Sequence, residues 1–187
     1  RVALYAVPEH RADREVDAGQ LAAGSDPDQR PNLLPGVGRD EQLADVITRG
    51  VKAYHRWNID SMIDAAPAKI WSQFILKEYH IGEDTLAPIA EELAFLYETR
   101  LYLRQMRPEI PQVLARIQAL GLKIGCISNT QSLGQVPANL AEYGIAQYFN
   151  PVVLSSAYGR RKPDPSIFHH AARLAQVPAG ACAYIGD

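Results

Sequence analysis

The sequence predicts an α/β protein: a Rossmann-like parallel sheet core with helices on both faces, plus an additional all-helical segment. Two observations predict this fold. From residue 105 to residue 187, short and wholly apolar segments alternate with amphipathic helical patterns, which is typical of parallel strands buried on both faces. Residues 38–104 show helical periodicity and no alternating strand pattern. The chain of 187 residues, 47% hydrophobic and 21% charged, has an ordinary globular composition and can bury a sizeable core.

Residues 1–37 are predicted to form a short strand and a long loop associated with the α/β core. Residues 2–7 form a continuous apolar run, Val-Ala-Leu-Tyr-Ala-Val. The stretch from residue 8 to residue 38 is rich in Asp, Gly, Pro and Arg. Structureless loops of this length are uncommon in compact domains, so we expect this one to be mobile or to lie across a site.

Residues 38–104 are predicted to form a separate helical segment of three helices. The first begins near residue 40, where apolar residues follow helical spacing. The second covers about residues 60–79. The third begins with Asp84 as its cap and ends near Leu103. This segment therefore forms an all-helical insert before the α/β core.

Residues 105–187 are predicted to form that core. The expected order is helix 110–120, strand 122–127, helix 134–143, strand 152–154, helix 165–176 and strand 181–185. The sequence ends on what resembles the end of a buried strand, Tyr-Ile-Gly-Asp, and it begins without Met. We therefore expect it to be a piece of a longer chain.

Charge and hydropathy exclude several classes of function. The 19 basic and 21 acidic residues give a net charge of −2, too little positive charge to attract nucleic acid or an anionic membrane surface. No apolar run reaches the roughly 20 residues that span a bilayer, and the first residues lack a signal-peptide pattern. We expect a cytoplasmic protein with neither a nucleic-acid nor a membrane partner.

Polar side chains gather where predicted strands end. Ser128 and Asn129 follow strand 122–127, Asp187 follows the last strand, and Lys162 precedes a helix in the run Arg-Arg-Lys-Pro-Asp-Pro. Ligands of open α/β sheets bind beyond the carboxyl ends of the strands, so these groups should converge on one edge. A hydroxyl can hold phosphoryl oxygens, a lysine can neutralise them, and a carboxylate can hold Mg²⁺. Each residue taken singly also fits a structural role, as a turn, a cap or a solvated side chain.

Residues 105–187 resemble the haloacid dehalogenase (HAD) superfamily of hydrolases, most of which are Mg²⁺-dependent phosphatases. Three motifs carry the resemblance. Ile-Ser-Asn ends a strand at 127–129, Lys-Pro-Asp-Pro at 162–165 is followed by Ile-Phe, and Tyr-Ile-Gly-Asp ends a strand at 184–187. The resemblance implies that residues 38–104 are the family's helical cap, inserted between its first and second motifs.

The resemblance also implies a role for each of these polar residues. Ser128 would bind the phosphoryl group, the catalytic Lys162 would stabilise its charge, and Asp187 would help to hold Mg²⁺. Asn129 would shape the same loop and contact the substrate. Independently of the resemblance, Arg160 and Arg161, directly before Lys162, are expected to be solvated. The implied reaction is hydrolysis of a small phosphorylated metabolite through an aspartyl-phosphate. The Gly-Asp ending favours a phosphatase over a 2-haloacid dehalogenase, and the substrate and oligomeric state stay open.

The family's nucleophile, an Asp in an Asp-x-Asp motif at the end of the first strand, has no counterpart in the sequence. Two explanations stay open. In one, residues 2–7 are that first strand, and Ala6 and Pro8 replace the two Asp residues, which leaves a non-catalytic binding or scaffold module. In the other, which we favour, the first strand lies upstream of Arg1 and residues 2–7 belong to the hairpin that follows it. The intact protein is then expected to be the phosphatase.

Overall fold

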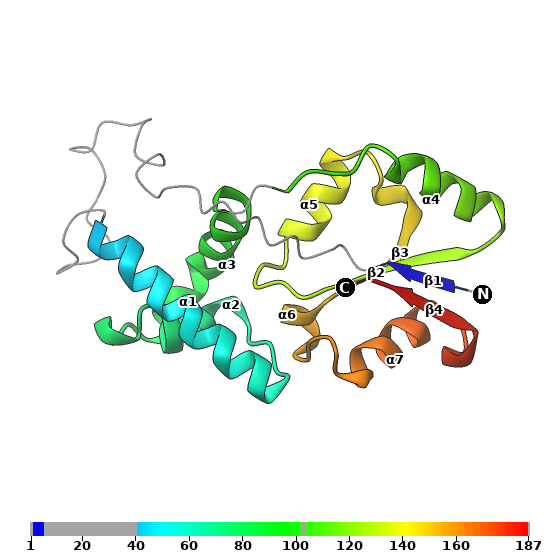
Figure 1. The fold of residues 1–187 in the computed structure, drawn as a ribbon. Helices are drawn as coiled ribbons and strands as arrows, with labels where there is room; N and C mark the ends of the chain where they lie inside the picture. Colours follow the sequence, from blue (N-terminus) through cyan, green and yellow to red (C-terminus); the bar gives the residue numbers. More distant parts are fainter. Residues whose placement is uncertain (1, 6–40, 102–103, 187) are drawn as a thin grey trace.

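Figure 1 shows the chain as a computed structural model, which describes residues 2–5, 41–101 and 104–186. The predicted loop at 8–38 lies outside the described residues. So do three of the residues discussed above, namely Ala6, Pro8 and Asp187.

Four parallel strands form one sheet in the order β3-β2-β1-β4. Their bounds are β1 Val2–Tyr5, β2 Lys123–Ser128, β3 Phe149–Leu154 and β4 Cys182–Ile185. The predicted α/β class and parallel sheet are confirmed. β1 lies between β2 and β4, where Tyr5 pairs with Cys126 on one side and Ile185 on the other. In the HAD superfamily, which the sequence resembles, the first strand lies between the strands of the second and fourth motifs. The position of β1 therefore favours the explanation in which residues 2–7 are that strand.

Helices cover both faces of this sheet (Figure 1). On one face lie α4 (Ile110–Ala119) and α5 (Gln135–Glu142), and on the other lies α7 (Pro165–Leu174). Side chains of a strand alternate between its faces, and β2 shows the result. Ile124 packs with α4 and α5, whereas Ile127 packs with α7. The apolar sequence of β2 therefore fills two core clusters at once.

Residues 41–101, called the helical region below, have an apolar core of their own. Its elements are α1 Glu41–Ser61, α2 Pro67–Ile70, a π-helical turn Trp71–Ile75, a 3-10 turn Lys77–Tyr79 and α3 Glu83–Arg100. The helix predicted over 60–79 is wrong in its first part, because α1 continues to Ser61 and the chain then turns. Met62 has a positive φ of 56°, and Pro67, which has no N–H to donate, starts the next helix. None of the described helices is long and apolar enough to cross a membrane.

Candidate active site

Ser128 is the last residue of β2 and lies at the carboxyl edge of the sheet. β2 is an inner strand, flanked by β1 and β3, and Ser128 pairs with Leu154 at the end of β3. The side chain is only 8% exposed. A hydroxyl at the end of an inner strand is held on a rigid element, which suits a group that must bind a ligand in one geometry.

Asn129 joins this strand end to the loop of Lys162, which lies 33 residues further along the chain. The Asn129 side-chain Nδ2 donates to the Lys162 carbonyl at 3.1 Å, and Oδ1 accepts from the Lys162 N–H at 2.8 Å. The amide therefore holds Lys162 by both polar groups of its backbone. In this structure Asn129 positions the lysine loop, and its contact with a substrate stays a prediction.

The backbone of Lys162 is held by Asn129, and its side chain lies near β4. Its Nζ is 5.7 Å from the centroid of the Tyr184 ring, within the range of a cation–π interaction. The lysine side chain is half-buried, so its charge is partly shielded from water. The structure thus brings the segments of Ser128 and Lys162 together at one edge, beside the end of β4. Asp187, predicted to share this edge, lies outside the described residues.

Asp164 in the Lys-Pro-Asp-Pro run caps the helix α7. Its Oδ1 accepts from the Ser166 N–H at 2.8 Å, a typical N-cap hydrogen bond. Hydrogen bonding by Ser166, with a smaller contribution from the Arg160 guanidinium, lowers the pKa of the Asp164 carboxyl below its ordinary value of 3.8. The end of the Lys162 loop is therefore held at the start of α7, on the side away from Asn129 in the sequence.

Arg161 is not solvated, which corrects the expectation from the sequence. Its guanidinium Nη1 lies 3.5 Å from Oδ1 of Asp64, and the two side chains are 14% and 4% exposed. Asp64 also accepts hydrogen bonds from the Tyr54 hydroxyl at 2.7 Å and from Nδ2 of Asn58 at 3.0 Å. Burial, reinforced by the Asp64 charge, raises the pKa of the Tyr54 hydroxyl. The partner of Arg161 lies far away in the sequence, on the helical region, so no local pattern reveals it.

Two carboxylates of α3, Glu91 and Glu98, contact the loop that follows Asn129. Neither residue is predicted as part of the site. The signal available in the sequence is their spacing of i, i+7, which places both on one side of the third predicted helix. Charged residues on one side of a helix are usually solvated, so this spacing alone does not indicate a contact.

The described side chains do not by themselves fit Mg²⁺. This ion prefers several oxygen ligands at near-octahedral geometry. Across residues 2–5, 41–101 and 104–186, no three His, Cys, Asp or Glu side chains come together as a metal site. The acid on the Lys162 loop, Asp164, is engaged with Ser166. A magnesium requirement therefore stays a prediction that depends on Asp187.

Comparisons with known proteins agree with this geometry. The family described as haloacid dehalogenase-like hydrolase matches residues 23–187. The haloacid dehalogenase-like hydrolase domain-containing protein 3 of Bos taurus is 33% identical over 128 residues, which are 63% of this chain and 47% of the relative. A glyceraldehyde 3-phosphate phosphatase of Methanopyrus kandleri is 28% identical over 99 residues, 53% of this chain and 42% of the relative. A phosphoglycolate phosphatase of Cupriavidus necator is 30% identical over 90 residues, 48% of this chain and 38% of the relative.

The chain spans less than half the length of these three relatives. The family match, by contrast, covers most of the chain and includes the strand end at Ser128, the loop of Lys162 and the whole helical region. The parallel sheet and its polar carboxyl edge are the architecture that the sequence resemblance implies. On this basis the chain belongs to the haloacid dehalogenase-like hydrolase family.

Proposed function

We propose that the intact protein is a phosphatase that hydrolyses a small phosphorylated metabolite at the carboxyl edge of this sheet. The observation that carries the proposal is the pair of hydrogen bonds between the Asn129 amide and the backbone of Lys162. They join the end of β2, which carries the Ser128 hydroxyl, to the backbone of Lys162, and a phosphoryl group needs both a donor and a positive charge. Relatives named as phosphatases of glyceraldehyde 3-phosphate and phosphoglycolate support the same class of substrate.

Each residue has a defined part in the proposed reaction. The Ser128 hydroxyl donates to a phosphoryl oxygen, and the Lys162 ammonium stabilises the negative charge of the phosphoryl group as it is transferred. An Asp carboxylate from outside the present sequence attacks phosphorus, and the bond between phosphorus and the substrate oxygen breaks, so the organic group leaves as an alcohol. Water then attacks the aspartyl-phosphate and releases inorganic phosphate and the free carboxylate. Magnesium, held with the help of Asp187, is part of the proposal as a cofactor.

The nucleophile is the element on which the proposal depends most. β1 occupies the place of the strand that carries this carboxylate in the family, and the sequence continues from Tyr5 with Ala6, Val7 and Pro8. None of these three side chains can attack phosphorus. This observation favours a second candidate function, a non-catalytic HAD-like module that binds a phosphorylated ligand at the same edge. A 2-haloacid dehalogenase is the third and least favoured candidate.

One set of measurements separates these candidates. The intact mass of the purified protein is determined first, and a mass above 20.6 kDa means that residues outside the present sequence are available to supply the nucleophile. A phosphatase screen with and without Mg²⁺ follows, alongside a test for halide release. Turnover of a phosphate monoester supports the phosphatase, whereas phosphate binding without turnover supports the binding module. Halide release without metal supports the dehalogenase.

Substitutions test the assignment of the site. Ser128→Ala and Lys162→Ala should each lower kcat/KM for a phosphate monoester by about 10² or more, the cost of removing one donor that stabilises transition-state charge. Lys52→Ala, at an exposed lysine on α1, is the matched control and should leave turnover unchanged. Unaltered turnover in both site variants would contradict the assignment of these residues.

A further inference from the structure

α3 of the helical region places two carboxylates against the loop that follows Ser128 and Asn129. Glu91 and Glu98 are two helical turns apart and lie on one side of α3. Their partners in this loop lie within residues 131–134, directly before the start of α5. This loop is the continuation of the strand end that carries the proposed phosphate-binding hydroxyl.

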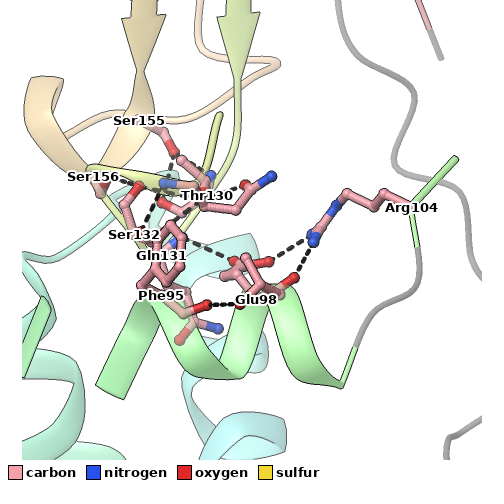
Figure 2. Close-up of polar contacts among 10 residues, drawn as sticks. Phe95, Glu98, Arg104, Thr130, Gln131, Ser132, Ser155 and Ser156 are labelled. Carbon is pink, nitrogen blue, oxygen red and sulfur yellow. Dashed lines mark hydrogen bonds and ion pairs between the residues drawn. The ribbon is translucent and has the colours of Figure 1, made fainter. Parts of the chain in front are cut away.

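Glu98 is the buried carboxylate of the two that contact this loop (Figure 2). The residue is 7% exposed, and its Oε1 accepts from the Gln131 N–H at 3.1 Å. Its Oε2 lies 2.6 Å from Nη2 of Arg104, and the other guanidinium nitrogen donates to the Glu98 carbonyl. Arg104 balances the charge that burial of this carboxylate would otherwise leave uncompensated.

Glu91 is the second carboxylate of α3 that contacts this loop. Its Oε1 accepts from the Ser132 hydroxyl at 2.6 Å and from the N–H groups of Leu133 and Gly134, both at 2.9 Å. Its other oxygen is also 2.9 Å from the Leu133 nitrogen. Ser132 then accepts from the Gly134 and Gln135 N–H groups at 3.1 and 3.0 Å. The Glu91 carboxylate thus accepts from the two N–H groups directly before α5, and the Ser132 hydroxyl oxygen accepts from the first N–H of the helix.

The same loop is also held from within the α/β part of the chain. Ser155, directly after β3, accepts from the Thr130 N–H at 3.0 Å through its hydroxyl oxygen. The Ser156 hydroxyl donates to the Ser132 carbonyl at 3.4 Å (Figure 2). The backbone between Ser128 and α5 is therefore fixed on one side by the end of β3 and on the other by α3.

We propose that Glu91 and Glu98, the α3 carboxylate pair, are positioning residues for the phosphate-binding edge. They set the path of the loop after Ser128 and so tie the place of that hydroxyl to the place of the helical region. The inference rests on the proposed phosphate-binding role of Ser128. It adds that the helical region takes part in building the anion site, through hydrogen bonds to backbone rather than through contact with substrate.

The test uses three variants of the full chain: Glu98→Gln, Glu91→Gln and the control Glu92→Gln, at the exposed neighbour on α3. All measurements are made where circular dichroism shows each variant fully folded, which removes a loss of stability as an explanation. Inorganic phosphate is the probe, and its Kd is measured together with hydrogen exchange at the amides of residues 131–134. Where the protein turns over a phosphate monoester, kcat and KM are determined separately.

We expect exchange at the Gln131 amide to accelerate about tenfold or more in Glu98→Gln, and exchange at the Leu133 and Gly134 amides similarly in Glu91→Gln, because each variant loses a charge-assisted hydrogen bond. The phosphate Kd and the KM should rise by about the same factor if the full free-energy cost of the weakened loop contact reaches the phosphate site at Ser128. The control should change neither. The two variants are independent, so Glu91→Gln carries the test if Glu98→Gln does not fold.

Three outcomes overturn the inference or one of its parts. Accelerated loop exchange with an unchanged phosphate Kd shows that the pair has a merely structural role. Unchanged exchange in both variants shows that the hydrogen bonds do not hold the loop. If the unaltered protein binds no phosphate, the proposed function fails, and the exchange data then decide by themselves whether the pair holds the loop.

Discussion

The helical region and the α/β part of the chain meet at two junctions that are built differently. At the first, two carboxylates of α3 accept hydrogen bonds mainly from backbone N–H groups of the loop after β2. At the second, residues 62–64 exchange backbone hydrogen bonds with residues 159–161, directly before Lys162. There the Asp64 carboxylate also faces the Arg161 guanidinium, and both side chains are mostly buried.

The difference determines which changes each junction can tolerate. Backbone N–H groups are offered by every residue except proline, so the first junction depends on the acceptors of α3 and little on the side chains of the loop. The second depends on a matched pair of side chains, and removal of one leaves the other charged and buried. We therefore expect the junction at Lys162 to be the more costly one to break.

The largest effect is expected for Arg161→Ala. Loss of the guanidinium leaves the Asp64 carboxylate, 4% exposed, without its counter-charge, and breaking a buried pair in this way costs about 3 kcal/mol or more of the free energy of unfolding. Arg160→Ala is the matched control, because Arg160 is 49% exposed and its pair with Asp164 at 3.6 Å is a surface contact that contributes little to stability. Urea denaturation measures the free energy of unfolding of both variants. Equal losses in the two variants would contradict the buried-pair explanation.

Asn129 connects the two junctions, so its substitution tests whether they act together. Asn129→Ala removes both hydrogen bonds to the Lys162 backbone and should lower the free energy of unfolding by about 1–2 kcal/mol. Asn129→Asp keeps the acceptor for the Lys162 N–H but places a carboxylate oxygen against the Lys162 carbonyl, so it should not recover the loss. Hydrogen exchange at the Lys162 amide provides the second measurement. Unchanged exchange at that amide in Asn129→Ala would show that the two loops are held independently.

Asp164 holds the loop of Lys162 from within the α/β part alone, and we expect its effect to be the smallest. The pKa of its carboxyl is lower in the folded protein than its ordinary value, so its contribution to stability is present above that value and is lost as the pH falls through the lowered pKa. Asp164→Ala should therefore lower Tm at pH 7, and the difference from the unaltered protein should shrink below about pH 3.8.

Asp164→Asn is the control for this pH dependence. An asparagine keeps an oxygen that can accept from the Ser166 N–H but does not titrate in this range. Its Tm should lie close to that of the unaltered protein at pH 7. A gap between Asp164→Ala and the unaltered protein that stays constant down to pH 2 would show that the carboxyl pKa is not lowered by folding.

The sequence predicts the class of the fold because strand and helix periodicities are local properties. The apolar run of β2, the helix start at Asp164 and the helical periodicity of α1 and α3 all follow from residues close together in the chain. The helix predicted over 60–79 fails at residues 62–66, where the chain departs from the helix to pair with residues 159–161. That contact is tertiary, and no local propensity encodes it.

The same distinction applies to the candidate site. Ser128, Asn129 and Lys162 can be found from their place after strands and in motifs, and the structure brings their segments together. The roles of Arg161, Glu91 and Glu98 depend on partners from other parts of the chain. A charged side chain is predicted to be solvated unless its partner is known, which is why Arg161 is misjudged from the sequence and the two glutamates are not identified. The place of β1 between β2 and β4 likewise depends on strand order, which the apolar run of residues 2–7 does not specify.

We propose that the carboxyl edge of the sheet, and no other part of the described chain, binds a phosphoryl group. The most direct test is a titration of the full chain with inorganic phosphate, followed by the NMR shifts of backbone amides. The account predicts the largest shifts at Ser128, Asn129 and Lys162. The strongest contrast is the opposite edge, where a cavity of about 360 Å³ is lined by residues that include Lys123 and Gln176. Shifts concentrated at those two residues, with none at Ser128 or Lys162, would contradict the account.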